Sequence, residues 1–417
     1  MDKKKLAIWS LYDFANSIVM IAFFLYYSQW LVIEKGVSDF WFNMTFAGSS
    51  LLLLLTAPIA GSITDKIKVK MPGLRVTTAL SFLFFTLTGV NVAFFPGHYV
   101  VSMFLFAVAT YFYLFCFVFY NALLGDVAKP EKHGAASGWG IFGNYAGQMV
   151  GLLVTLPLVT GAISLWGAHG RAQALIPSAV LFFILALPML LFFKENERRQ
   201  KVTVSLCQEY RGAIELFKSL VKIPGLGRFF LAYFFFNDAV ITASNNFPIY
   251  LEKVFAVSDT TKTYILVLIL IASAVGAVFS GWVTDRVGHK KSLLGVLGGW
   301  VIIFILMAAT TNFKFFVVLS GLMGLWFGAI WTVTRALVTQ LTPPHVLNQS
   351  FTYYTLMERF ATFIGPVSWG LIVMLPYKAG GLNYRIAALS MSVFVFLGLI
   401  IAKKLPGNKN IADDPNA

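Results

Sequence analysis

Twelve apolar stretches fill nearly the whole chain and limit what it can fold into. A helix needs about 20 apolar residues to cross the hydrocarbon core of a bilayer. The composition agrees, because 58% of the residues are hydrophobic and only 12% are charged, against roughly 25% charged in soluble domains. We therefore expect an all-α membrane protein with twelve transmembrane helices, at about 6–33, 40–64, 72–95, 98–126, 134–163, 171–194, 225–252, 260–284, 290–310, 313–342, 348–375 and 382–403.

A repeat is visible in two loops that lie 220 positions apart. Residues 281–291 follow the pattern G-x-x-x-D-R-x-G-x-K-K, and residues 61–70 carry a degraded copy with Lys68 in place of glycine. Asp13 and Asp238, in the first helix of each half, are 225 positions apart. We expect two pseudo-symmetric six-helix bundles, and such repeats place a substrate site at their interface near the bilayer midplane.

One long hydrophilic stretch separates the two halves. Within it Leu206, Tyr210, Ile214 and Phe217 recur at helical spacing, which predicts an amphipathic helix on the membrane surface. The expected organisation is an N-terminal bundle at 1–194, a cytoplasmic linker with this helix at 195–224, a C-terminal bundle at 225–404 and a disordered tail at 405–417.

The formal net charge of +14 is distributed unevenly along the chain. Most lysine and arginine residues fall in the loops on the side of the two termini, so both termini are expected in the cytoplasm. Basic clusters beside a membrane meet anionic lipid headgroups. We therefore expect the lipid bilayer, and no nucleic acid, as the partner of this charge.

The inventory of reactive residues argues against an enzyme. All five histidines (98, 133, 169, 289 and 345) lie in loops, which leaves no histidine-based metal site at membrane depth. The dipeptide Gly-Lys never occurs, so the chain has no Walker phosphate loop and no sign of ATP-driven pumping. We expect no catalytic residues, no metal and no cofactor.

Five ionisable residues fall inside the apolar stretches: Asp13, Asp238, Glu358, Arg335 and Arg359. Each costs a few kcal/mol at the bilayer centre, so each is expected to face the bundle interior or a water-filled cavity. They either form structural acid–base pairs or bind a substrate or a coupling proton. Arg335 is the natural partner of Glu358. Three acids and two bases leave one acid without a base, and burial favours the neutral form of such an acid, which makes it a candidate proton carrier.

Polar side chains accompany these charges on helices five and seven. Asp238, Thr242, Asn245 and Asn246 form a stripe before Pro248, which is expected to kink or break helix seven and free carbonyl groups there. Alternatively, these side chains only satisfy the freed backbone. On helix five, a ridge of Gly143, Gly147 and Gly151 predicts close helix packing. The adjacent face carries Asn144 and Gln148, which Asn121 of helix four could join.

The candidate residues are taken from the patterns above, together with the tyrosine and the asparagines that lie near the charged residues in the sequence. The candidates for binding substrate or a proton are Tyr12, Asp13, Asn16, Asn121, Asn144, Gln148, Asn237, Asp238, Asn245, Arg335, Glu358 and Arg359. The candidates for gating are loop residues at cytoplasmic helix ends, where a carboxylate can cap a neighbouring helix: Asp65, Asp285 and Arg286.

Several of these motifs resemble a known family. The two loops resemble the loop between the second and third helices of each half in the major facilitator superfamily. Residues 12–17 (YDFANS) with Trp9 look like the helix-one signature of its vacuolar amino-acid effluxer-like branch, known from yeast autophagy and from bacteria. Residues 119–124, 137–147, 232–238, 334–337 and 359–366 are similar to later helices of that branch.

The resemblance implies a secondary active transporter of a small polar solute, most simply amino acids, working by alternating access, with a proton as a candidate coupling ion. The alternatives are uptake of nucleosides, peptides or sugar derivatives, or a receptor or scaffold that no longer transports. A monomer in a bacterial inner membrane is expected.

Overall fold

The computed structural model describes residues 2–67, 69–128, 133–195, 206–343, 347–360, 363–376 and 381–407. Helices and their connections make up these ranges, with no strand among them. The chain divides into two compact units, Met1–Arg211 and Gly212–Ala417, which are described one at a time. The predicted all-α class is confirmed.

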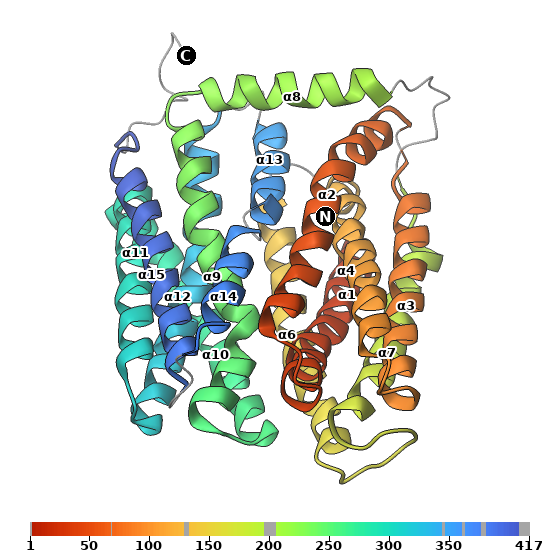
Figure 1. Ribbon diagram of the computed structural model, residues 1–417. Helices are drawn as coiled ribbons and strands as arrows, with labels where there is room; N and C mark the ends of the chain where they lie inside the picture. Colours follow the sequence, from red (N-terminus) through yellow and green to blue (C-terminus); the bar gives the residue numbers. More distant parts are fainter. Residues whose placement is uncertain are drawn as a thin grey trace. The chain divides into compact units, whose positions relative to one another are not determined.

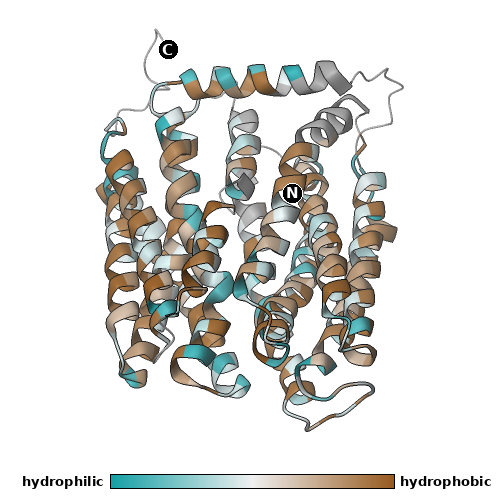
Figure 2. Cartoon of the chain, viewed as in Figure 1, coloured by the Kyte–Doolittle hydropathy of each residue, from teal (hydrophilic) through white to brown (hydrophobic). Residues whose placement is uncertain are grey.

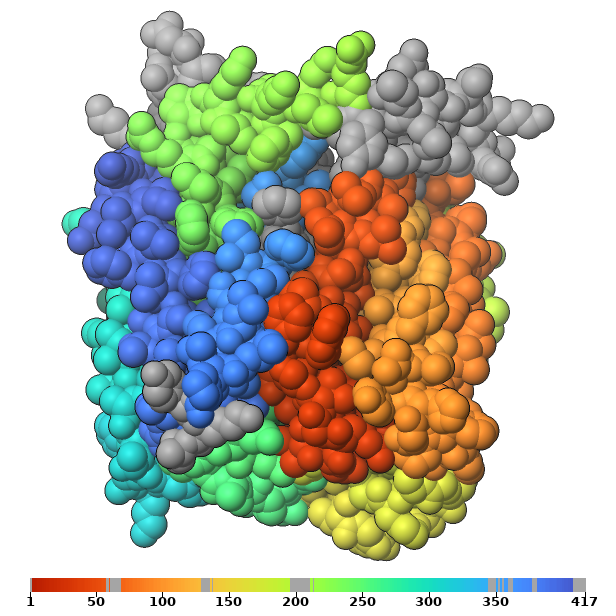
Figure 3. All heavy atoms as spheres, viewed as in Figure 1, coloured from red at the N-terminus to blue at the C-terminus, as the bar shows by residue number. Residues whose placement is uncertain are grey.

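Unit 1 begins with one long helical segment, which is followed by separate helices (Figure 1). Its elements are α1 (Lys3–Ala22), the π-helical turns η1 (Phe23–Tyr27) and η2 (Trp30–Glu34), α2 (Asp39–Ile67), α3 (Met71–Phe94), α4 (Tyr99–Ala122), α5 (Leu124–Val127), α6 (His133–Val159), the 3-10 turn η4 (Gly170–Ala174) and α7 (Leu175–Phe192). The side chains of α2, α3 and α4 (red to orange) cover one face of this unit (Figure 3).

Unit 2 is entered through α8 (Leu206–Lys222), which runs across the direction of the helix that follows it (Figure 1). Its other helices are α9 (Leu226–Phe255), α10 (Asp259–Val287), α11 (His289–Ala309), α12 (Phe313–Leu341), α13 (Leu347–Phe360), α14 (Ile364–Val373) and α15 (Leu382–Lys403). The predicted eleventh span is present as two helices, α13 and α14.

The helices have the length and composition of membrane spans. Eleven helical segments of the described chain are long and apolar enough to cross a membrane, and the shorter α14 is also apolar. Large apolar side chains lie on their outer surfaces, such as Phe104 of α4, 67% exposed, and Val278 of α10, 78% exposed. Apolar residues run along both units, whereas apolar and polar residues alternate along α8 (Figure 2). Exposure of this kind is expected of surfaces that face lipid rather than water.

Glycines allow the helices of each unit to pack closely. In unit 1, α6 lies so near α1 that a Cβ atom on Gly147 would be 2.2 Å from the carbonyl oxygen of Phe14. In unit 2, a Cβ atom on Gly328 of α12 would be 1.8 Å from the carbonyl oxygen of Ser273 of α10. The glycine ridge predicted on helix five is confirmed as a packing surface against α1.

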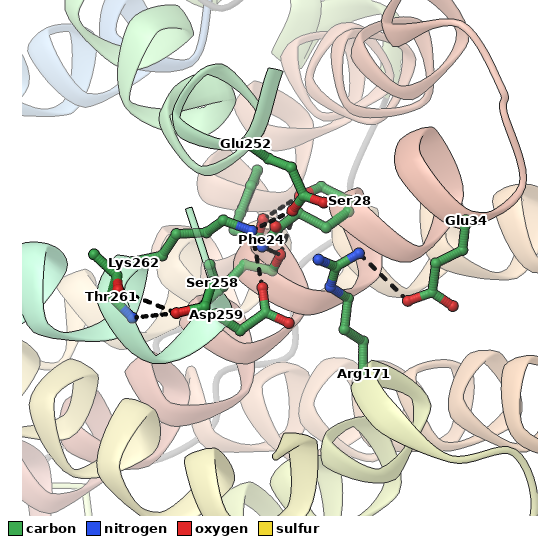
Figure 4. Close-up of polar contacts among 11 residues, drawn as sticks. Phe24, Ser28, Glu34, Arg171, Glu252, Ser258, Asp259, Thr261 and Lys262 are labelled. Carbon is green, nitrogen blue, oxygen red and sulfur yellow. Dashed lines mark hydrogen bonds and ion pairs between the residues drawn. The ribbon is translucent and has the colours of Figure 1, made fainter. Parts of the chain in front are cut away.

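Ion pairs fix the helix ends of each unit (Figure 4). In unit 2 the Lys262 ammonium, whose side chain is fully buried, pairs with Glu252 at the end of α9 and with Asp259 at 2.9 Å. In unit 1 the Arg171 guanidinium lies 3.4 Å from a carboxylate oxygen of Glu34. The first cluster joins two consecutive helices across a short connection.

Candidate functional site

The polar residues predicted on helices one and five of unit 1 come together. Asp13 lies in the middle of α1 and is 8% exposed. Its Oδ1 atom accepts a hydrogen bond from Nδ2 of Asn144 at 3.1 Å, and Asn144 Oδ1 accepts one from Nε2 of Gln148 at 2.7 Å. The spacing of four residues places the two amides one turn apart on the same face of α6. A carboxylate is thus oriented by a short chain of amide groups.

A group of three stacked aromatic rings includes Tyr120, which lies close enough to the Asp13 carboxylate to interact with it electrostatically. Trp9 stacks on Tyr120 with ring centroids 4.5 Å apart, and Tyr12 stacks on the same ring at 5.3 Å. The Trp9 indole donates to the carbonyl of Tyr120, and the Tyr120 hydroxyl donates to the carbonyl of Trp9, both at 3.2 Å. Gly140 makes room for the ring, since a Cβ atom there would be 2.6 Å from Trp9. Aromatic faces near a carboxylate suit a cationic group.

Our sequence reasoning missed Trp9 and Tyr120 as part of this cluster, although Trp9 stands in the helix-one motif. Tyr12 was predicted to bind substrate or a proton, and its hydroxyl is hydrogen-bonded to Oγ1 of Thr78 on α3 at 2.7 Å. The bond ties α1 to α3 and gives Tyr12 a structural contact. Asn16, one turn further along α1, is fully buried.

Asn121 is placed differently from the other candidates of unit 1. Its side chain is exposed, in the last turn of α4. In the described part of the chain it is hydrogen-bonded to neither Asn144 nor Gln148. The expected extension of the amide chain to Asn121 is therefore not present in this structure.

In unit 2, Asp238 of α9 binds the start of α14. Its Oδ2 atom accepts a hydrogen bond from the backbone N–H of Gly365 at 2.6 Å, and its side chain is fully buried. A Cβ atom on Gly365 would be 2.3 Å from Oγ1 of Thr242 and 2.8 Å from Oδ1 of Asp238. A carboxylate, a hydroxyl and a helix N-terminus therefore meet around one glycine.

A second polar cluster of unit 2 lies on α12 and α13. The Tyr354 hydroxyl is 2.9 Å from Oγ1 of Thr334. The ring centroids of Tyr354 and Tyr233 are 4.6 Å apart. Arg335 and Glu358 both lie close enough to these two tyrosines to act on them electrostatically. The predicted ion pair between Arg335 and Glu358 stays a prediction.

The remaining candidates of unit 2 are Asn237, Asn245 and Arg359. The side-chain amide of Asn237 donates to the carbonyl of Glu358 at 3.2 Å, which links α9 to α13. Asn245 is half-buried on α9. The side chain of Arg359 lies outside the described residues.

Pro248 does not break the helix, because α9 continues as one α-helix from Leu226 to Phe255, and the alternative of a kink there stays a prediction. Proline is tolerated inside membrane helices where nearby groups satisfy the backbone. Close to Pro248, the Asn246 side chain donates to the carbonyl of Thr242 at 2.9 Å and the Ser244 hydroxyl donates to Val240 at 2.7 Å, and neither of these two bonds reaches the carbonyl of Ser244 that the proline leaves without its helical donor. The break in this part of the unit lies instead before Ile364.

The gating candidates lie at helix ends. The Asp65 side chain is outside the described residues, and Asp285 is exposed at the end of α10. The Arg286 guanidinium lies 3.8 Å from the ring centroid of Trp282, one turn before it. That these residues set the conformational balance stays a prediction.

A carboxylate that the sequence did not single out caps α3. Glu195, just after α7, accepts the backbone N–H of Lys70 at 2.8 and 3.0 Å and that of Met71. In unit 2 the corresponding contact has the opposite polarity, since the Lys290 ammonium at the start of α11 donates to the carbonyl of Leu405 at 2.6 Å. Both contacts join the third membrane helix of a unit to the end of its sixth.

Across the described residues, no group of three or more His, Cys, Asp or Glu side chains is arranged to hold a metal ion. The clusters instead offer carboxylates, amides, hydroxyls, aromatic rings and one described arginine. These groups can bind the charged and polar ends of a small organic solute.

Comparisons with known proteins agree with this architecture. The model of the Major Facilitator Superfamily matches residues 10–258 and 229–413. An uncharacterized MFS-type transporter, YxiO of Bacillus subtilis, is 23% identical over 95% of this chain and 94% of its own. Autophagy-related protein 22 of Cryptococcus neoformans is 24% identical over 45% of this chain and 34% of its own. Among solved structures, a mutant of the nucleoside transporter NupG aligns over 96% of this chain and 99% of its own, with a TM-score of 0.75 and 12% identity.

Proposed function

The chain belongs to the major facilitator superfamily, and on this premise we propose that it moves a small zwitterionic solute, most simply an amino acid, across the membrane by alternating access. The superfamily and the fold make it a transporter embedded in a bilayer. The proposal adds the chemical class of the substrate.

The observation that carries the proposal is the Asp13 cluster. Its carboxylate is held by Asn144 and lies beside Tyr120, whose ring stacks with those of Trp9 and Tyr12. A carboxylate with aromatic neighbours is suited to an ammonium group, through a charge-assisted hydrogen bond and cation–π attraction. We assign the amino group of the solute to this cluster.

The carboxylate end of the solute requires a basic group. Of the two arginines predicted at membrane depth, Arg335 in unit 2 is the one whose side chain the structure describes. Its guanidinium can bind a carboxylate through two parallel hydrogen bonds. Tyr354, on which Arg335 acts electrostatically, supplies an aromatic neighbour. We propose that Arg335, with Arg359 as the second candidate, recognises this end of the solute.

A proton is the proposed coupling ion, carried by one of Asp13, Asp238 and Glu358. A buried carboxylate favours its neutral form, so binding and release of a proton can accompany the change of state. The resemblance of the helix-one motif to the vacuolar amino-acid effluxer-like branch makes amino acids the first class to test, and the nucleoside transporter of the same fold makes nucleosides the second.

The same reasoning extends to the surroundings of the transporter. We propose a bacterial inner membrane with both termini in the cytoplasm, on the excess of lysine and arginine in the loops on that side. We propose a monomer as the transporting unit. Reporter fusions at each terminus and size determination in detergent test these two points.

The experiment is a thermal-shift screen of the purified protein against amino acids, nucleosides, peptides and sugars. Asp13→Asn is compared with Glu34→Gln, a control carboxylate of the same unit that lies exposed at a helix end. We expect amino acids to raise the Tm of the wild type and of the control, and Asp13→Asn to lose most of that rise. Stabilisation by nucleosides alone would favour the alternative, and no stabilisation together with no transport in proteoliposomes would favour a receptor.

A further inference from the structure

We propose that Asp238 is a proton-operated cap of α14: ionised, it holds the N-terminus of this half-helix through Gly365, and protonated, it loosens that hold. The proposal rests on the proposed transport function for the use of this proton. The proton site itself is argued from the contacts of Asp238 alone.

The first step is the place of Asp238 at a helix start. Phe363 is the N-cap residue of α14 and has no side-chain acceptor to offer. The first N–H groups of a helix have no partner within the helix. Oδ2 of Asp238 reaches across from α9 and accepts the N–H of Gly365 at 2.6 Å. This capping contact comes from a different helix, so it also fixes α14 against α9.

The second step is the unsatisfied half of the same carboxylate. Asp238 and Thr242 are both fully buried, and Oδ1 of Asp238 and Oγ1 of Thr242 have no hydrogen-bond partner among the described residues. Both atoms lie within 2.8 Å of the point that a Cβ atom on Gly365 would occupy. A buried carboxylate oxygen with no donor is costly when charged, and protonation removes that cost. The neighbouring hydroxyl can donate to the carboxylate or accept from the acid, so Thr242 senses the charge of Asp238 without determining it.

Among the described residues, no basic group competes for Asp238. The charged groups described on the helices packed against α9 are Lys314 and Arg335 on α12, Glu358 on α13, and Arg385 and Lys403 on α15. None of these groups acts on Asp238, whose charge is affected by its burial and by the hydrogen bond from the N–H of Gly365. The tyrosines on these helices, such as Tyr354, interact with Arg335 and Glu358 instead.

The two effects on Asp238 therefore oppose each other. Burial favours the neutral acid, and the helix N-terminus favours the carboxylate, because negative charge is stabilised there and a charged acceptor makes the stronger hydrogen bond. A group held between two such effects changes its charge with modest changes of its surroundings. The element it controls, α14, belongs to the same membrane span as α13, which carries Glu358.

The test of the proton site is a pH-difference infrared spectrum of the purified protein, which requires no substrate. Between about pH 6 and about pH 9, ordinary exposed carboxyl groups stay ionised, so a carboxylic-acid band that changes there reports a buried acid. We expect one such band in the wild type, its loss in Asp238→Asn, and its displacement in Thr242→Val, which keeps the shape and removes the hydroxyl.

Asp13→Asn and Glu358→Gln test whether one of the other two acids gives the band instead. Loss of the band in either of them, with the band retained in Asp238→Asn, would overturn the assignment, as would a Thr242→Val spectrum identical to that of the wild type. Thr242→Val decides the matter if Asp238→Asn does not fold.

The test of the cap is hydrogen exchange of α14 at the two ends of the same pH range, corrected for the intrinsic pH dependence of exchange. We expect the amides of the first turn to exchange several-fold faster at the low end in the wild type and equally at both ends in Asp238→Asn, whose amide oxygen still accepts the Gly365 N–H. Equal protection in the wild type contradicts the cap. A cap that responds to pH in a protein that transports no amino acid would contradict the substrate proposal and leave this one standing.

Discussion

The side-chain amide of Asn144 donates its hydrogen bond to Asp13 at 3.1 Å, and so fixes the direction of the one carboxylate of α1. Asp238, at the equivalent place in the second unit, is fixed by the backbone N–H of Gly365 instead. In each unit the donor comes from the fifth membrane helix. The repeat has thus kept the contact between the first and fifth helices while changing the group that makes it.

Asn144→Ala should weaken solute binding several-fold, and Asp13→Asn about tenfold or more. The first change leaves the acid and removes its orientation, whereas the second removes a charge-assisted hydrogen bond worth about 1.5–3 kcal/mol. Affinities of the single and double variants, measured with the solute that the thermal-shift screen identifies, form a double-mutant cycle. Fully additive losses would show that Asn144 does not act through Asp13.

Gly147→Ala should destabilise the protein by about 1–3 kcal/mol, because its Cβ atom would lie 2.2 Å from the carbonyl oxygen of Phe14 and force α6 away from α1. Gly138→Ala in the same helix is the matched control, since a Cβ atom there meets nothing within 4 Å. Denaturant unfolding in detergent measures both. Equal stability of the two variants would mean that the close helix contact contributes nothing.

Lys262→Met should destabilise the protein by about 3 kcal/mol, because it leaves two carboxylates, Glu252 and Asp259, without the buried charge they share. Lys253→Met, at an exposed position near the end of α9, removes an equal charge and should change stability little. Thermal unfolding compares the two. If Lys253→Met were as unstable as Lys262→Met, the loss of stability would come from the change in net charge rather than from the ion-pair cluster.

Glu195→Ala should cost about 0.5–2 kcal/mol, the usual range for the loss of a helix N-cap. The carboxylate accepts N–H groups of both Lys70 and Met71 at the start of α3, and its charge also suits a helix N-terminus. Glu215→Ala, exposed on α8, serves as the control. Local hydrogen exchange at residues 70–74 should quicken only in Glu195→Ala, and its absence would argue against the cap.

The membrane helices and the paired amides of the unit 1 cluster could be predicted from the sequence because both rest on local patterns, whereas the stacking of Trp9 on Tyr120 joins distant parts of the chain and was missed. Apolar length marked the spans, and the positions of Asn144 and Gln148, one turn apart beside a glycine ridge, placed both amides on one face of α6. Asp13 had to meet polar partners because an acid facing lipid is too costly.

The break in unit 2 could not be predicted in this way, because one proline of this unit lies inside a helix and another lies at a helix start. Pro248 lies well inside α9, where a missing N–H is tolerated by its neighbours. Pro366 falls in the first turn of α14, where the N–H would have no partner within the helix in any case. The pair Gly365-Pro366 was therefore a signal for a helix start, but only the contact with Asp238 distinguishes it from a proline inside a helix.

The π-helical turns that follow α1 have a consequence for how this helix changes during evolution. One residue added to an α-helix rotates everything beyond it by about 100°, and π turns are where a helix accommodates such an extra residue. The turns at Phe23–Tyr27 and Trp30–Glu34 lie between Asp13 and the outer end of the helix. Tyr27, hydrogen-bonded to Ser102 at 3.0 Å, ends the first of these turns, so its direction is not set by the helical register of α1. Insertions or deletions beyond Ala22 can realign the outer end while the carboxylate of Asp13 keeps its direction.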